Sequence, residues 1–385
     1  METTARIKPA SRDAGLDRTR ILAFFLVVSV HFFIGSGFYD NPVQGEKMYI
    51  MTAIRTLSMS CVPLFLLITG FLTRSTAAEL SPRGYLAYCG KLRRHLLTYV
   101  IAALFVNCFL YLVSAQTDFF AVINNIFGFA QYGWYFEMYL GLFALIPFLA
   151  RLFGTLEKKE ATVLVAVLLF LSAAPSVFNI FNIRAFPHIL SGGEKLALIP
   201  DWWAEITYPL TYWALGAYLG KFVDIKKMST FRVSLLLVIS LILFTVFNIV
   251  CSGGGEFAWG KHNNWGGVEN TVLSVLLFLL LNSIKGKPLG KKHASFLKLV
   301  SELTFGAYLV SYTFDRMFYT LLREAVSEVW DRFPFYPIAV VFVAVMSLVI
   351  SFLIHLIVSA ITDGADGHRE KRMAKKEEKT TSVSL

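Results

Sequence analysis

Cysteine and charge are both scarce in this 385-residue chain, and their scarcity excludes several kinds of site. The four cysteines are scattered and form no C-x-x-C pair, so neither a disulfide framework nor a metal site is predicted. No Walker loop, G-x-G-x-x-G or H-E-x-x-H motif occurs, which argues against ATP-driven transport within the chain and against zinc hydrolysis by that motif. Charged residues make up 16% of the sequence, whereas 56% is hydrophobic and 15% aromatic. Soluble domains are typically less apolar, so the balance indicates a membrane protein.

Long apolar segments predict an all-α, polytopic membrane protein. A helix needs roughly 18 or more largely apolar residues to cross the hydrocarbon core. We predict ten spans in a single bundle, at 21–39, 49–73, 96–115, 133–153, 161–180, 205–223, 232–251, 268–285, 302–322 and 336–361. The stretch 119–130 is too short to cross and is expected to be interfacial or re-entrant. We therefore expect an N-terminal segment at 1–15, a membrane domain at 16–362 and a disordered basic tail at 363–385.

The net charge of +10 is explained by topology rather than by a nucleic-acid partner. Most Lys and Arg residues fall in the N-terminal segment, the tail and alternate loops between predicted spans. Loops rich in Lys and Arg stay in the cytoplasm, so both termini are expected to be cytoplasmic, with basic residues near anionic membrane lipids. The first apolar segment is too long for a cleavable signal peptide and has no A-x-A site. We expect it to remain as a helix of a multi-pass protein in the cell membrane.

Arg20 and His31 lie eleven residues apart within the first apolar segment. Eleven residues make about three helical turns, so both side chains fall on one face, about 16 Å apart along the helix axis. One end of that distance is the membrane surface and the other is near the bilayer midplane. A titratable ring at that depth indicates a functional site, although a histidine hydrogen-bonded between helices is the structural alternative. The pair suits a substrate with an anionic head and a reactive tail.

Residues 16–31, LDRTRILAFFLVVSVH, resemble the opening motif of the acyltransferase-3 family of membrane acyltransferases, in which an Arg and a His are separated by ten residues. Further segments resemble motifs of that family in the same order: VPLFLLITGF at Val62–Phe71, KLRRHLLTY at Lys91–Tyr99, the stretch Trp134–Leu152, YPLTYWALGAYLG at Tyr208–Gly220 and FGAYLVSY at Phe305–Tyr312. The resemblance implies transfer of an acyl group, usually acetyl from acetyl-CoA, to a hydroxyl of an envelope glycan. Thr69, Thr98 and Ser311 depart from the family pattern, and Ser311 stands where many members have a histidine.

Acyl transfer gives several polar residues an expected role. Transfer to an alcohol needs a base or a nucleophile, and a neutral imidazole at His31 suits either. Glu137, near the outer end of the fourth span, is expected to orient His31 or to bind a sugar hydroxyl. Arg20, Arg93 and Arg94 are expected to hold the phosphates of acyl-CoA, with anchoring at the cytoplasmic surface as the alternative.

Other polar and aromatic residues are candidates for binding the acceptor. We assign Arg55, Trp134 and Asp315 to substrate binding, although a structural ion pair such as Arg55 with Glu137 explains the buried charges equally well. The glycine-rich outer loop at 252–267 carries tryptophans, a histidine and amides. These side chains fit sugar recognition or an aromatic belt at the membrane boundary.

The sequence therefore predicts a membrane O-acyltransferase that uses acetyl-CoA or another acyl-CoA as donor and a cell-envelope glycan or lipid-linked sugar as acceptor. The alternative is a transporter or exporter of a small molecule or lipid-linked sugar, which would use the same buried charges for its substrate or for protons. The chain has no clear internal repeat, which disfavours a transporter. A non-catalytic scaffold would explain the spans but not the buried polar residues.

Overall fold

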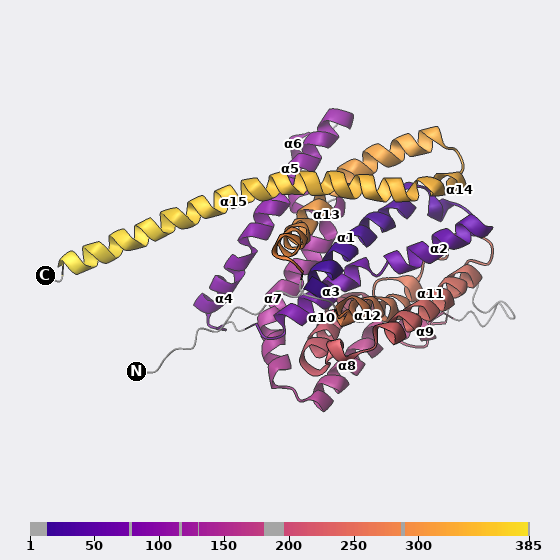
Figure 1. Ribbon diagram of the computed structural model, residues 1–385, viewed down its shortest axis with the longest axis horizontal. Helices are drawn as coiled ribbons and strands as arrows, with labels where there is room; N and C mark the ends of the chain where they lie inside the picture. The colour runs from indigo at the N-terminus through magenta and orange to yellow at the C-terminus, as the bar shows by residue number, and fades with distance from the viewer. Residues whose placement is uncertain are drawn as a thin grey trace.

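A computed structural model of the protein describes residues 14–76, 79–114, 118–129, 131–180, 196–285 and 289–383. Every regular element in these ranges is helical (Figure 1). In chain order the helices are α1 (Ala14–Gly35), α2 (Glu46–Ser58), α3 (Cys61–Thr73), α4 (Pro82–Cys89), α5 (Arg93–Ser114), α6 (Phe119–Phe127), α7 (Trp134–Thr155), α8 (Lys158–Ser172), α9 (Ala174–Phe178), α10 (Ala204–Phe222), α11 (Thr230–Ser252), α12 (Val268–Ser283), α13 (Lys291–Ala325), α14 (Val329–Arg332) and α15 (Tyr336–Val383).

These helices confirm the all-helical membrane fold. Within the described ranges, six helical stretches are long and apolar enough to cross a membrane: Ala14–Asp40, Glu46–Thr73, Pro82–Val113, Phe119–Thr155, Thr230–Ser252 and Val329–Gly364. The other four predicted spans fall on α8 with α9, on α10, on α12 and on α13. Two of these helices, α8 and α12, have only 15 and 16 residues.

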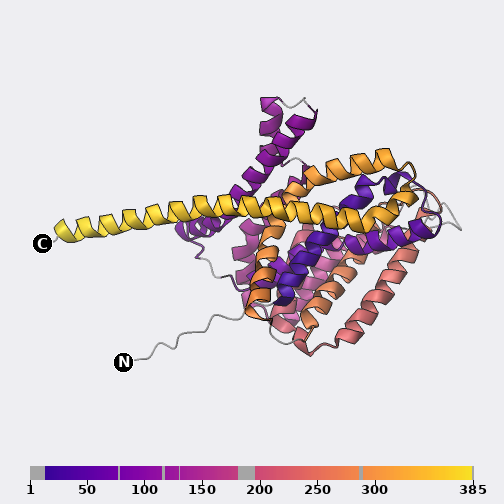
Figure 2. The ribbon, with the colours of Figure 1, turned by 45° about the horizontal axis from the view of Figure 1, so that its top comes forward.

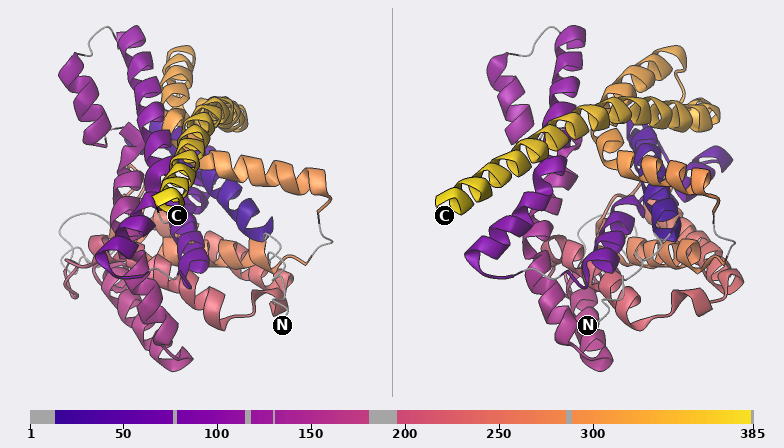
Figure 3. Two further views of the ribbon diagram at one scale, coloured as in Figure 1. Left: turned by 90° about the vertical axis from the view of Figure 1, so that its left-hand side faces the viewer. Right: turned by 60° about the vertical axis from the view of Figure 1, so that its left-hand side comes forward.

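Two predicted segments differ in detail from the structure. The span at 49–73 is broken after Ser58, so that α3 begins at Cys61 with Pro63 in its first turn, where a proline removes no helical hydrogen bond. The tail at 363–385 was expected to be disordered, but α15 continues as a helix to Val383 and extends beyond the bundle (Figure 1, Figure 3). This part of the tail is rich in Glu, Lys and Arg and has no proline, a composition that favours helix.

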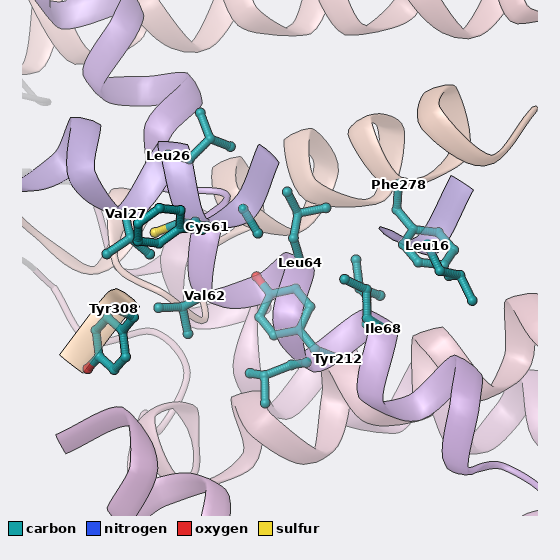
Figure 4. Close-up of a cluster of buried hydrophobic side chains, with 14 of the residues drawn as sticks. Leu16, Leu26, Val27, Cys61, Val62, Leu64, Ile68, Tyr212, Phe278 and Tyr308 are labelled. Carbon is teal, nitrogen blue, oxygen red and sulfur yellow. The ribbon is translucent and has the colours of Figure 1, made fainter. Parts of the chain in front are cut away.

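Helix α1 is the centre of the bundle, in contact with α2, α3, α12, α13 and α15. Around it the outer part of α5 and the short helix α6 form a hairpin that projects from the bundle (Figure 2). A buried core joins α1 to its neighbours (Figure 4), with side chains that include Leu16, Leu26, Val27, Val62, Leu64, Ile68, Tyr212, Phe278 and Tyr308. The first helix is therefore fixed from several sides, and its polar residues have defined surroundings.

Helices α3 and α10 pack closely because a glycine of each lies against the backbone of the other. A Cβ atom at Gly70 would overlap the carbonyl oxygen of Trp213, and one at Gly216 would overlap the carbonyl oxygen of Leu67. Small residues allow this approach between membrane helices, where van der Waals packing replaces the hydrophobic effect. Both glycines belong to segments that resemble family motifs, so the close contact gives those motifs a structural reason.

Candidate functional site

One cavity of about 530 Å³ runs along α1 and reaches both Arg20 and His31. Its volume is typical of a small-molecule site. The walls come from α1, α3, α7, α13, the start of α5 and the loop between α11 and α12, with lining residues that include Val27, Val30, Ile34, Cys61, Val62, Phe65, Ile68, Thr69, His95, Gln131, Tyr132, Trp134, Tyr135, Tyr139, Trp259, Trp265, Ser301, Glu302, Thr304, Phe305 and Tyr308. The spacing of Arg20 and His31 predicted that both side chains lie on one face of α1. That face forms a wall of this cavity.

The end of the cavity at Arg20 is polar. The Nη1 atom of Arg20 donates a hydrogen bond to Ser301 Oγ at 3.0 Å and lies 3.8 Å from Asp17 Oδ1. His95 and Glu302 also line this end. Arg20 is only partly buried, with 26% of its side chain exposed.

Arg93 and Arg94 do not line the cavity, whereas Arg20 does. Arg94 instead forms an exposed ion pair with Asp363 of α15, at 3.0 Å between Nη2 and Oδ1. Successive residues of a helix point about 100° apart, so only one of Arg93, Arg94 and His95 can face the cavity. His95 is that residue.

His31 is paired with Asp315 of α13. The Nδ1 atom of His31 lies 3.0 Å from Asp315 Oδ2, and Asp315 is 3% exposed. Asp315 does not line the cavity, so it supports His31 from behind. A carboxylate in this position orients an imidazole and stabilises its protonated form. The sequence placed Asp315 among the substrate-binding residues, and the geometry gives it a different partner.

Glu137, which was expected to orient His31, lies elsewhere. It is exposed on α7 and does not line the cavity, whereas Tyr135 and Tyr139 of the same helix do. Residues two apart in a helix point to nearly opposite sides, which explains why Glu137 faces away from the cavity when Tyr135 faces it. The structure therefore does not bring Glu137 to the cavity that His31 lines.

Tyr132 covers the ring of His31 and was not singled out from the sequence. The two rings are stacked, with centroids 3.9 Å apart and an interplanar angle of 25°. The hydroxyl of Tyr132 donates a hydrogen bond to Asp315 Oδ2 at 2.8 Å. Tyr132 lies in the short turn Gln131–Gly133 before α7, where no helical periodicity could have pointed to it.

The end of the cavity at His31 is aromatic. Trp134, Trp259 and Trp265 all line it, and the rings of Trp134 and Trp265 are stacked at 5.9 Å between centroids. Trp259 and Trp265 come from the loop at 252–267, which was proposed from its composition as a sugar-binding or boundary segment. The structure brings this loop to the same cavity as Trp134.

Arg55 is fully buried and does not line the cavity. It pairs with Glu269 rather than with Glu137, at 3.8 Å between Nη1 and Oε1. Its Nε donates to the hydroxyl of Tyr39 at 3.0 Å, and its guanidinium lies over the ring of Trp259 at 4.6 Å. Arg55 therefore supports the back of a cavity-lining tryptophan, and the structural ion pair considered from the sequence exists with a different carboxylate.

Thr69 and Ser311 both depart from the family pattern, but only Thr69 lines the cavity. The hydroxyl of Thr69 donates to Phe65 O at 2.8 Å. Ser311 is buried away from the cavity and donates to Tyr308 O at 2.8 Å. A hydroxyl at position 311 therefore does not take part in the site formed around His31.

A family model for an acyltransferase domain, that of the acyltransferase 3 family, matches residues 13–356. The matched range contains the whole cavity and every helix from α1 to α14. No curated protein and no solved structure matches the chain.

Proposed function

We propose a specific reaction for this chain, which belongs to the acyltransferase 3 family and is an integral membrane O-acyltransferase. It moves an acyl group, acetyl by family resemblance, from acyl-CoA to a hydroxyl of a cell-envelope glycan or lipid-linked sugar. The observation that carries the proposal is one continuous cavity that joins a cation at Arg20 to a histidine–carboxylate pair at His31. Membership of an acyltransferase family removes the support for a transporter.

The donor fits the long axis of this cavity. Arg20 can bind a phosphate group of CoA through a charge-assisted fork. The distance to His31, about 16 Å along α1, is then available for the extended thiol arm of CoA. Apolar side chains such as Val27, Val62 and Phe65 line the cavity and suit an uncharged chain. The thioester carbonyl would thereby reach the imidazole.

His31 is proposed as the general base. Asp315 lies on Nδ1, so Nε2 is the ring nitrogen left for the reacting groups. It takes the proton of the acceptor hydroxyl as the oxygen attacks the thioester carbonyl. The carbon–sulfur bond then breaks, and the leaving thiolate of CoA receives the proton from the imidazolium. The products are an O-acyl ester and CoA thiol, and the histidine is regenerated.

The acceptor is proposed to enter at the tryptophan end of the cavity. The apolar face of a sugar ring packs well on an indole ring, and its hydroxyls then lie at the ring edge. Trp134, Trp259 and Trp265 offer three such surfaces beside His31. The charge asymmetry of the loops supports an orientation in the cell membrane with this end at the outer side and both termini in the cytoplasm.

The donor and acceptor are tested together. Purified protein in lipid discs is given acetyl-CoA labelled in the acetyl group and envelope glycan from cells that lack the gene. Labelled ester on the glycan, with one CoA thiol released per ester, is expected. Protein that binds no acyl-CoA would overturn the donor, whereas label trapped on His31 without acceptor would make that residue a nucleophile instead of a base.

The orientation is tested by labelling. Glu256 lies in the loop at the tryptophan end and is exposed, and Lys227 is exposed in the turn between α10 and α11. With the native cysteines replaced, Glu256→Cys should react with an impermeant maleimide in intact cells, and Lys227→Cys should react only after lysis. The reverse pattern would contradict cytoplasmic termini.

A further inference from the structure

Tyr132 contacts both groups on which the proposed reaction depends, His31 and Asp315. Its ring lies on the face of the His31 imidazole, and its hydroxyl donates to the carboxylate of Asp315. We propose that Tyr132 is a positioning residue of acyl transfer, which holds the imidazole of His31 in register with the carboxylate of Asp315. This inference rests on the proposed role of His31 as the base.

One oxygen atom of Asp315 serves two groups. Asp315 Oδ2 accepts the hydrogen bond of Tyr132 at 2.8 Å and lies 3.0 Å from His31 Nδ1. A carboxylate fixed by a hydroxyl has less freedom to rotate away from the imidazole. Hydrogen bonds to a charged acceptor are stronger than those between neutral groups.

The plane of the His31 imidazole is restrained as well. A histidine ring can turn about its Cβ–Cγ bond, and a turn would move Nε2 away from the cavity. Tyr132 stacks on the ring with centroids 3.9 Å apart and an interplanar angle of 25°. The stack restrains the ring plane while Asp315 restrains Nδ1, so the direction of Nε2 is set by two contacts.

Tyr132 is itself held firmly. The hydroxyl of Tyr308 donates to the backbone oxygen of Tyr132, and the ring of Tyr312 meets that of Tyr132 edge-on at 5.1 Å between centroids. Gln131, the residue before it, has a φ of 60°, which a non-glycine residue adopts only at a cost in free energy. A backbone conformation of this kind persists where neighbouring contacts enforce it. Here it places the phenol ring of Tyr132 over the imidazole of His31.

Tyr132→Phe tests the hydroxyl while keeping the stacked ring. We expect kcat to fall about ten- to hundred-fold, the loss that corresponds to a hydrogen bond to a charged group. The KM values for acyl-CoA and acceptor should stay within about two-fold, because the hydroxyl acts on the chemical step. Tyr99→Phe is the matched control: Tyr99 donates to Ile126 O at 2.8 Å just before the same turn and has no contact with Asp315.

A double-mutant cycle identifies the path of the effect. If Tyr132 acts through the carboxylate, Tyr132→Phe should lower kcat less than about two-fold further in an Asp315→Asn protein. Effects that multiply would overturn the proposal, as would a raised KM with unchanged kcat in Tyr132→Phe. Should Tyr132→Phe fail to fold, Tyr308→Phe, which removes the tether of the turn, must lower kcat at unchanged KM.

The inference and the proposed function fail in different ways. Tyr132→Phe with full kcat, beside a His31→Ala protein without activity, would refute the positioning role and leave the base in place. A His31→Ala protein that retains activity would refute the proposed function itself.

Discussion

His31 and Asp315 meet at 3.0 Å between Nδ1 and Oδ2, which ties the first helix of the bundle to α13 inside the apolar core. Asp315→Asn should keep the packing and remove the charge that stabilises a protonated imidazole. We expect kcat to fall about 10²- to 10⁴-fold, the range seen when general-base catalysis is lost. Steady-state kinetics of purified protein measures the change. Asp363→Asn, which alters only the exposed pair with Arg94, should stay within about two-fold, and equal losses in both variants would contradict a special role for Asp315.

The second prediction concerns His31 itself. His31→Ala should abolish acyl transfer and leave membrane insertion intact, because loss of a base removes the chemical step whereas one packing contact does not decide insertion. His31→Gln, which keeps a polar side chain of similar size, should be equally inactive. His355→Ala in α15 is the control, since His355 does not line the cavity. Residual activity above about a tenth in His31→Ala would refute the assignment of the base.

The donor gives the third prediction. Arg20→Ala should raise the KM for acyl-CoA more than it lowers kcat, and Arg20→Lys should recover only part of the affinity because an ammonium lacks the bidentate fork. The structure leaves Arg93 and Arg94 outside the cavity, so the double change of both to Ala should alter KM less than about two-fold. Titration of acyl-CoA at saturating acceptor measures both. If the double change raised the KM for acyl-CoA more than Arg20→Ala does, the phosphate site would instead lie at the start of α5.

The acceptor end gives the fourth prediction. Trp259→Ala and Trp265→Ala should each raise the KM for acceptor several-fold, since stacking on an aromatic ring contributes affinity, and should leave the KM for acyl-CoA unchanged. Trp202→Ala is the control, because Trp202 is 86% exposed and lies outside this cavity. A changed KM for acyl-CoA with an unchanged KM for acceptor would mean that the acceptor enters elsewhere.

Helical periodicity explains why much of the site could be predicted. The alignment of Arg20 and His31 follows from the spacing of two residues in one apolar helix, and the structure places both on one cavity. Periodicity could not predict which carboxylate pairs with His31. Glu137 and Asp315 are both carboxylates in apolar segments, and only the packing of α13 against α1 decides that Asp315 meets His31. Tyr132 lies in a turn with no repeating pattern, so periodicity could not select it.

The last prediction separates support from substrate binding at Arg55. Arg55→Leu leaves the Glu269 carboxylate buried and unpaired, which typically costs about 3–5 kcal/mol of stability. We therefore expect a clearly lower Tm, and partial recovery in Arg55→Leu with Glu269→Leu, where both charges are gone. The exposed pair of Lys47 with Asp331 is the control, and Lys47→Ala should leave Tm almost unchanged. The KM for acceptor should rise only modestly, through loss of the contact behind Trp259. An unchanged Tm with a strongly raised KM for acceptor would make Arg55 a substrate-binding residue, as its position in an apolar span first suggested.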